Sequence, residues 1–509
     1  MNKKGVIKYL QNNEFNIQKA FATYTIVEVA FENYAKTDII NGIEFGPVFA
    51  YFDFSDRYPF YQIIRQDAIS GISDKLYADF LKNQKSLDRV FNQSRKLTKK
   101  IDQAWKIYDK NNSQEEIFSI FLKILEIAST WWQFAAILED KGDVINRKIV
   151  SKFQGKYKLS STDAGDLVMK LSHPSEMAIY TEERRQFLNI CQYFLNKSKQ
   201  KERLLKNKYE EIVQDGKISE LLKQYEKDFF WFKSDFYKAV KITDFGILAD
   251  VLREIKTKTS VQIKNEIKEI DKNFKELLKE KQKLRKKIKL SKEELKDIYF
   301  AERIIYWTDQ RKIEMMKQLY YIYVLFEEIA KSFNIKYRDL AVYTLDEVCL
   351  LIRKGIKVNK INLKKRHNSM FIVCEKNKKT QIIYGNEARK LLAVVQSATH
   401  KELKGMVASG GGAQKIRGKV CVVSNPEKIN FNEGEVLVTS MTRVEFVPMM
   451  RKAKAIITDE GGIACHAAIV SREMNKPAII GTKNATRILK DGDIVEMNMQ
   501  TGEIRIIKK

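Results

Sequence analysis

The sequence contains little cysteine, proline or histidine, and it has no long apolar run. Its five cysteines lie far apart and form no Cys-x-x-Cys pair, which argues against a disulfide framework or a zinc site. Lys123 and Glu126 interrupt the most apolar window, residues 117–138, so no membrane helix is expected. The N-terminal stretch MNKKGVIKYLQNNEF lacks the apolar core of a signal peptide. We therefore expect a cytoplasmic protein without a metal site.

The charge is strongly of one sign, with a net value of +27 over 509 residues. A basic surface attracts polyanions such as nucleic acid, anionic lipid or phosphorylated small molecules. Here the lysines are spread over the whole chain and do not cluster with aromatic residues. We interpret the charge as general lysine enrichment, and a nucleic-acid-binding protein remains only a distant alternative.

Proline and glycine usage changes near residue 400. Only three of the six prolines precede this point, and glycines are dense after it. Because both residues interrupt helices, a tract nearly free of them predicts helix. The expected fold class is therefore multidomain, α plus α/β: a large, mostly helical N-terminal body followed by a compact C-terminal domain. We place the divisions at residues 1–300, 301–395 and 401–509.

Local patterns refine the body. Residues 113–141 have the apolar spacing of a buried helix, and Ser113 with Glu116 predicts a capping box at its start. The charged run 261–289 predicts a protruding helical hairpin or a short coiled coil. Residues 369–385 read as a β-hairpin that turns at 377–379. No role is assigned to residues 1–300.

The C-terminal domain is predicted to contain six short strands and three helical pieces. Each strand is a β-branched run bounded by turn residues. The strands are expected within 418–425, 434–440, 453–459, 476–482, 492–498 and 502–508, and the helices within 444–453, 466–475 and 484–491.

One of the four histidines stands in the stretch DEGGIACHAAIVSRE, at position 466. A predicted strand ends at Gly461-Gly462, and a helix begins near His466. The start of a helix presents unpaired N–H groups and favours negative charge. A neutral imidazole is also a good nucleophile near physiological pH. His466 could therefore carry a phosphoryl group, or it could simply pack or cap the helix.

This stretch closely resembles the phosphohistidine, or swivelling, domain of the enzymes that use phosphoenolpyruvate (PEP): PEP synthase, pyruvate phosphate dikinase and rifampicin phosphotransferase. The resemblance covers about residues 401–509, where Thr458, Gly461, Gly462, His466 and Arg472 fill family positions. It implies a swivelling β/β/α domain with His466 as the transiently phosphorylated, catalytic residue. Gly461, Gly462, Thr458 and Arg472 would shape the loop or position the phosphate; for Arg472, a solvated helix residue is the alternative.

One position departs from PEP synthases and dikinases. A threonine that is a regulatory phosphorylation site in those enzymes corresponds here to Ala464. That form of control is therefore not expected. Cys465, directly before the histidine, is interpreted as a packing residue and not as a nucleophile.

The helical tract lacks the glycine-rich loop of an ATP-grasp domain, and no PEP-binding barrel is expected in this protein. Residues 300–395 resemble the helical linker of rifampicin phosphotransferase, and also the histidine-bearing subunit of phenylphosphate synthase, whose ATP-binding part is a separate polypeptide. These resemblances imply a phosphotransferase component that receives its phosphoryl group from a separate ATP-grasp partner holding ATP and Mg²⁺, or from a PEP-type donor. Residues 394–412, ending in Ser409 and three glycines, would be its hinge.

The acceptor is expected to be a small molecule, but the sequence identifies no substrate-binding residues. His173, Arg184 and Arg185 could line an acceptor site, or they could be surface and capping residues. Trp131 and Trp132 fit a helical core better than a ligand pocket. The alternative function is a non-catalytic phospho-relay or an interaction scaffold.

Overall fold

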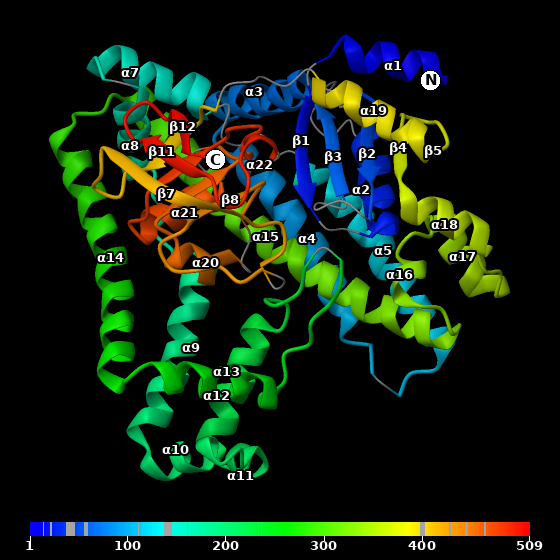
Figure 1. Ribbon diagram of the computed structural model, residues 1–509, viewed down its shortest axis with the longest axis horizontal. Coiled ribbons are helices and arrows are strands. Elements are labelled where there is room, and N and C mark those ends of the chain that lie inside the picture. The colour runs from blue at the N-terminus through cyan, green and yellow to red at the C-terminus, as the bar shows by residue number, and fades with distance from the viewer. Residues whose placement is uncertain are drawn as a thin grey trace.

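The computed structural model describes residues 1–13, 15–20, 23–36, 46–54, 60–109, 111–136, 145–159, 161–235, 237–397, 403–426, 429–442, 446–462 and 465–508. Figure 1 shows three regions: a sheet with its covering helices near the N-terminus, a helical lobe formed by α9 to α13, and a C-terminal domain drawn in orange and red. No helix in these ranges is both long enough and apolar enough to cross a membrane.

The first region contains a five-stranded antiparallel sheet, of which the sequence predicted only the hairpin at 369–385. Its strand order is β1-β3-β2-β4-β5. Alternate side chains face two different cores, as the pleat of a strand requires. Helices α1 and α19 cover one face, and the main helical core covers the other. The elements are β1 (Phe15–Ala20), β2 (Val48–Phe52), β3 (Phe60–Arg65), β4 (Met370–Cys374), β5 (Gln381–Tyr384), α1 (Lys3–Gln11) and α19 (Asn386–Ser397).

The main helical core is organised around one long helix, α15. Trp131 and Trp132 are buried in this core, as predicted, and the Ser113–Glu116 capping box is present. The helices are α2 (Tyr24–Lys36), α3 (Gln66–Lys82), α4 (Lys85–Trp105), α5 (Gln114–Ala136), a π-helical segment (Ile145–Val150), α7 (Ser151–Tyr157), α8 (Ser161–Leu171), α15 (Lys292–Ser332), α16 (Tyr337–Leu340), α17 (Leu345–Lys354) and α18 (Lys360–Asn368).

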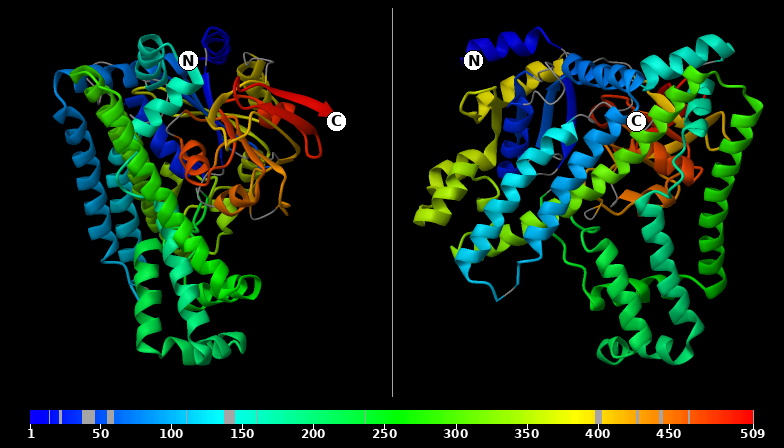
Figure 2. Two further views of the ribbon diagram at one scale, coloured as in Figure 1. Left: turned by 90° about the vertical axis from the view of Figure 1, so that its left-hand side faces the viewer. Right: turned by 180° about the vertical axis from the view of Figure 1, so that it is seen from behind.

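The helical lobe has a separate apolar core. Helix α14 spans this lobe and the main core: Ile263 is buried in the lobe, whereas Leu284 packs on the main core. The lobe lies at the bottom of both views in Figure 2. It consists of α9 (Ile179–Asn196), α10 (Ser198–Leu205), α11 (Tyr209–Val213), α12 (Gly216–Phe229) and α13 (Asp244–Thr257), and α14 (Ser260–Lys287) connects it to the main core. The prediction of a protruding hairpin at 261–289 was wrong, because α14 lies along α9 and α8.

The C-terminal domain is a seven-stranded sheet of order β12-β11-β7-β8-β9-β10-β6, with β7 to β10 parallel. All six predicted strands are present, and β6 is an additional one. Helices α20 and α21 pack with one core of this domain, and α22 packs with the other. The elements are β6 (Met406–Ser409), β7 (Lys415–Val422), β8 (Val436–Thr439), α20 (Val447–Lys452), β9 (Ala455–Thr458), α21 (His466–Glu473), β10 (Ala478–Ile480), α22 (Ala485–Ile488), β11 (Ile494–Asn498) and β12 (Ile504–Lys508).

The mostly helical body and the C-terminal sheet domain agree with the predicted fold class. The predicted division at residue 300 is not a structural boundary, since α15 runs through it. Strands β4 and β5, from the predicted linker, also join the sheet that holds β1 to β3. The β-hairpin turn is where we expected it, with Asn377 at a positive φ of 58°. Distant segments share this sheet, which a search for local periodicity does not reveal.

The predicted hinge is partly misplaced. Residues 398–402 lie outside the described residues. Ser409 already belongs to β6, which pairs with β10 inside the domain. Gly411 stands in the turn that follows and lies so close to Pro477 that an added Cβ would be 2.5 Å from its ring. The glycine turn is thus a packed part of the sheet domain, and it does not form the hinge that the sequence predicted there.

Candidate functional site

The site lies at the carboxyl ends of the parallel strands β8 and β9. The loop after β8 carries Thr442, and the loop after β9 leads to α21 and His466. Parallel strands that are neighbours bring these two loops together. The crevice outside the carboxyl ends is where open α/β sheets usually bind ligands. His466 therefore lies where the topology of the sheet favours a functional group.

His466 is half-buried at the first position of α21. Its Nδ1 lies 2.8 Å from the Thr442 hydroxyl. The preceding residue, Cys465, is the N-cap, and its Sγ accepts the Ala468 N–H at 3.4 Å. Cys465 thus caps and packs, in agreement with its predicted structural role. The Thr442 contact fixes the orientation of the imidazole ring.

Sequence reasoning did not select Thr442. A signal was available, because Thr442 stands just after the predicted strand 434–440, although the pairing of this strand with the histidine strand is known only from the structure. The two loops are also linked by other contacts: Ser440 donates its hydroxyl hydrogen to Glu460 at 2.8 Å, and the Glu460 N–H donates to the Ser440 carbonyl at 2.8 Å. These bonds hold the Thr442 loop beside the histidine loop.

The glycines of the histidine loop allow close packing. Gly461 has φ of +123°, and a Cβ there would lie 2.6 Å from the Cys465 Sγ. Gly481 has φ of +71°, and its Cβ would lie 2.7 Å from the Gly461 carbonyl oxygen. Gly462 accepts the Cys465 N–H at 2.9 Å. Only glycine fits where φ is positive and backbone approaches backbone so closely.

Thr458 and Asp459 hold the histidine loop in place through hydrogen bonds. Thr458 is fully buried and donates its hydroxyl hydrogen to the Glu460 carbonyl at 2.6 Å. The Asp459 carboxylate accepts the Thr486 N–H at 2.9 Å and so joins the loop to α22. Thr458 therefore stabilises the backbone of the loop that follows it.

Arg472 and Glu473 lie at the far end of α21. The Arg472 Nε donates to the Ala408 carbonyl of β6 at 2.8 Å, and burial lowers the pKa of the guanidinium to about 10. Glu473 is half-buried, and desolvation of its carboxyl group raises its pKa to about 7. Thr181 of α9 donates its hydroxyl hydrogen to the Glu473 carboxylate. Arg472 is therefore packed in this structure, at the end of the helix opposite to His466.

The N-terminus of α9 lies along α21. The ring of Tyr180 packs edge to face with the His466 ring, with their centroids 4.9 Å apart. Tyr180 and Ala178 are buried in the same apolar core as Ala467 and Met450 of the C-terminal domain. A residue 286 positions away in the sequence thus covers the histidine, and no local pattern could have predicted it.

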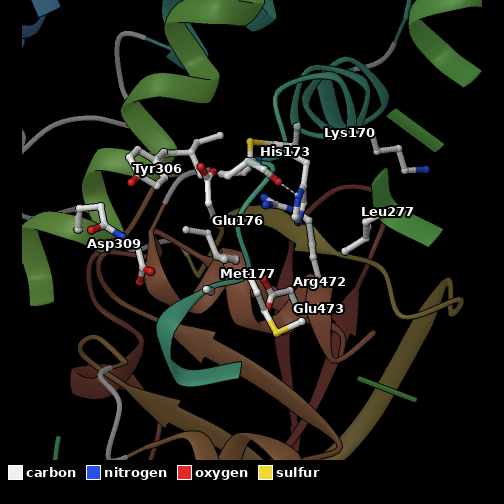
Figure 3. A pocket seen from close by; sticks show the side chains of 15 residues that line it. Lys170, His173, Glu176, Met177, Leu277, Tyr306, Asp309, Arg472 and Glu473 are labelled. Carbon is white, nitrogen blue, oxygen red and sulfur yellow. Dashed lines mark hydrogen bonds between the residues drawn. The ribbon is translucent and has the colours of Figure 1, made fainter. Parts of the chain in front are cut away.

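A pocket opens beside α21, close to the start of α9 (Figure 3). Its mostly apolar wall includes Met177 and Tyr306, and Arg472 and His173 point toward each other at its edge. Burial lowers the pKa of His173, and its Nδ1 lies 2.8 Å from the Pro174 carbonyl oxygen. The pocket therefore lies between the helical body and the C-terminal domain, and residues of both line it.

The two other arginines considered for an acceptor site have structural partners. Arg184 forms ion pairs with Glu254 at 2.5 Å and Glu266 at 2.9 Å. Arg185 pairs with Glu182, one turn before it on the same helix, at 2.8 Å. Within the described ranges, no group of three or more His, Cys, Asp or Glu side chains is arranged to hold a metal ion.

Comparison with known proteins identifies the class of the C-terminal domain. Residues 431–502 match the family model described as "PEP-utilising enzyme, mobile domain". This segment, which contains Thr458, Gly461, Gly462, His466 and Arg472, is therefore a mobile domain of the PEP-utilising enzymes.

Several similar proteins are named as PEP synthases. A probable phosphoenolpyruvate synthase of Archaeoglobus fulgidus is 51% identical over 111 residues, 21% of this chain and 14% of that protein. The phosphoenolpyruvate synthases of Pyrococcus furiosus and Synechocystis are 41% and 38% identical over 24% and 23% of this chain. These matches cover 16% and 15% of those two proteins. The similarity thus spans a small part of each relative.

Proposed function

We propose that this chain is the histidine-bearing component of a cytoplasmic phosphotransferase. His466 would accept a phosphoryl group and pass it to a small-molecule acceptor. The observation that carries this proposal is the contact between Nδ1 of His466 and the Thr442 hydroxyl at 2.8 Å, at the start of a helix in a mobile-domain sheet. The names of the relatives, which are PEP synthases, support phosphoryl transfer as the chemistry.

The Thr442 contact assigns roles to the two ring nitrogens. With Nδ1–H donating to the Thr442 oxygen, the lone pair resides on Nε2, which is then the nucleophile. Nε2 forms a bond to phosphorus while the bond from phosphorus to the donor oxygen breaks, and the electron pair leaves with the donor. The ring becomes cationic, and the Thr442 oxygen stabilises the proton on Nδ1.

The second transfer reverses the charge change. An acceptor hydroxyl oxygen attacks phosphorus, the N–P bond breaks, and its electron pair returns to Nε2. The acceptor proton passes to solvent, and the ring is neutral again. Both steps require in-line geometry, which a fixed ring orientation favours.

We propose that the phosphoryl donor is ATP bound with Mg²⁺ on a separate ATP-grasp polypeptide. The support is the sequence pattern of the helical tract, which contains no glycine-rich phosphate loop. The helical body, which packs on the mobile domain through α9, would bind the acceptor or dock the partner.

The test is mass spectrometry of the intact chain after incubation with Mg-ATP and a candidate ATP-grasp protein. One added phosphoryl group, labile in acid and stable in base, is expected on the wild-type chain and absent from His466→Ala. His367→Ala is the control, because that histidine pairs with Asp339 at 2.9 Å outside the mobile domain. Labelling that persists in His466→Ala contradicts the proposal.

A further inference from the structure

We infer that Tyr180 is a cap: in this docked arrangement it shields His466 from phosphoryl donors, and phosphorylation of His466 and docking of the mobile domain exclude each other. This inference rests on the proposed function, since it concerns the regulation of the same histidine. It assigns a role to the N-terminus of α9, which belongs to the helical body.

The first observation is the burial of the reactive atom. Nε2 of His466 is buried, although the residue as a whole is half-exposed. The Tyr180 ring packs against the imidazole with 4.9 Å between centroids, and Tyr180 itself is 1% exposed. An in-line attack needs space for phosphorus on Nε2 and for the leaving group beyond it. The docked arrangement closes this space.

The second observation is that the cap is held at several points. Thr181, next to Tyr180, donates its hydroxyl hydrogen to Glu473 at the other end of α21. Farther along the interface, Arg451 of α20 pairs with Glu266 of α14 at 3.1 Å. Ile179 packs against the apolar core of the mobile domain. Tyr180 is therefore fixed over the histidine by contacts on both sides.

The third step follows from chemistry. A phosphoryl group adds three oxygens and negative charge to the ring nitrogen. Tyr180 and its apolar neighbours, which include Ala178 and Met450, cannot solvate this charge. The two events are linked at equilibrium: if docking lowers the equilibrium constant for phosphorylation of His466 by some factor, phosphorylation lowers the affinity of the mobile domain for the helical body by the same factor.

The experiment uses phosphoramidate, a small phosphoryl donor that needs no partner protein, with the full-length chain. The rate of N–P bond formation at His466 is followed by mass spectrometry. Tyr180→Ala is expected to react about tenfold faster than the wild type, because the cap is removed, whereas Tyr180→Phe keeps a ring and should react at the wild-type rate. Equal rates for the wild type and Tyr180→Ala overturn the inference.

Two further variants separate uncapping from unfolding. Tyr343→Ala removes a buried tyrosine from the main helical core, outside α9 and the mobile domain, and should leave the labelling rate unchanged. If Tyr343→Ala also accelerates labelling, general loosening explains the result and the cap is rejected. Arg451→Gln weakens docking without touching either ring and should accelerate labelling; an unchanged rate contradicts the inference.

The result of the phosphoramidate experiment does not depend on the result of the labelling experiment with ATP. A chain that reacts with phosphoramidate only at His466, and faster in Tyr180→Ala, supports the cap even if no ATP-grasp partner ever labels it. A chain that is labelled from ATP at the same rate with and without Tyr180 supports the proposed function and refutes the cap.

Discussion

At the scale of single residues, the site depends on how His466 is oriented. The Thr442 hydroxyl lies 2.8 Å from Nδ1 of His466, and when Nδ1–H donates to this hydroxyl oxygen the lone pair is on Nε2. A wrong tautomer leaves the ring in place but blocks the nucleophile. The Thr442 hydroxyl should therefore affect the rate of phosphoryl transfer more than it affects the free energy of unfolding.

We predict that Thr442→Val lowers the rate of His466 phosphorylation about tenfold, since one hydrogen bond to the reacting ring is worth about 1–1.5 kcal/mol. Thr442→Ser retains the hydroxyl and should restore most of the rate. Both variants should melt within a few degrees of the wild type, as followed by circular dichroism. A Thr442→Val chain that is labelled at the wild-type rate would show that the ring needs no partner.

A second residue-scale prediction concerns Glu473. Burial raises its pKa to about 7 in the folded chain, from about 4.5 when it is exposed. The neutral form is therefore the stable one, and its contribution to stability is complete below about pH 4.5 and lost as the pH rises through about 7. Asp309, which faces Glu473 from α15, has a pKa raised to about 6 and acts in the same direction.

Glu473→Gln should remove this dependence, because the amide stays neutral. We expect the Tm of the variant relative to the wild type to rise between pH 5 and pH 8, as measured by thermal melts in matched buffers. Glu460→Gln, with a carboxylate outside this contact, should show no such trend. A constant difference in Tm across this range would mean that Glu473 is ionised in the folded chain.

Residue roles were predictable in part from the sequence. The family pattern located His466 and the glycines, because a loop that approaches another backbone closely tolerates few residue types. Thr442 stands just after a predicted strand, although the pairing of this strand with the histidine strand is known only from the structure. Tyr180 and Glu473 could not be assigned roles, because their contact depends on how two distant segments pack.

At the scale of elements, the loops around α21 depend on positions where only glycine fits. Gly481→Ala would impose positive φ on a residue with a side chain and place its Cβ 2.7 Å from the Gly461 carbonyl. We predict a loss of about 2 kcal/mol or more, seen as a lower Tm, together with slower phosphorylation.

Gly434→Ala is the matched control for this substitution. Gly434 also has positive φ, at +84°, but nothing lies within 4 Å of its added Cβ. The free energy of unfolding of Gly434→Ala should fall by only about 1 kcal/mol, because alanine disfavours positive φ, and the variant should keep the wild-type rate of phosphorylation. Equal losses at the two glycines would show that the close approach to Gly461 relaxes without cost.

The elements also show where local sequence is informative. The strands of the C-terminal domain are short β-branched runs between turns, and all six were predicted. Strand β6 was missed because it has only four residues, Met406–Ser409, and is flanked by glycines that resemble a linker. Strands β1 to β3 were missed because they are scattered in a tract that is otherwise rich in helix.

At the scale of the whole molecule, the mobile domain is held on the helical body by charged as well as apolar contacts. Arg451 adds to the ion pairs of Arg184 with Glu254 and Glu266, and burial lowers the pKa of the Arg451 guanidinium. Because Arg451 and Glu266 are both only partly exposed, removing one partner leaves a partly desolvated charge behind, which destabilises the interface.

We predict a coupling free energy of about 1–3 kcal/mol between Arg451 and Glu266 in a double-mutant cycle with Arg451→Gln and Glu266→Gln, measured by urea unfolding. The exposed pair Arg505–Glu503, at 3.3 Å on β12, is the control and should show almost no coupling. A coupling near zero for Arg451 and Glu266 would mean that the interface is held by its apolar contacts alone.

Strand β6 brings the incoming chain directly beside the histidine helix. The strand hydrogen-bonds along β10, and its Ala408 carbonyl receives the Arg472 Nε of α21, so the point of attachment and His466 belong to one stiff unit. Any rotation of the C-terminal domain would therefore carry β6 and His466 together, and the position of the histidine would follow the position of this strand.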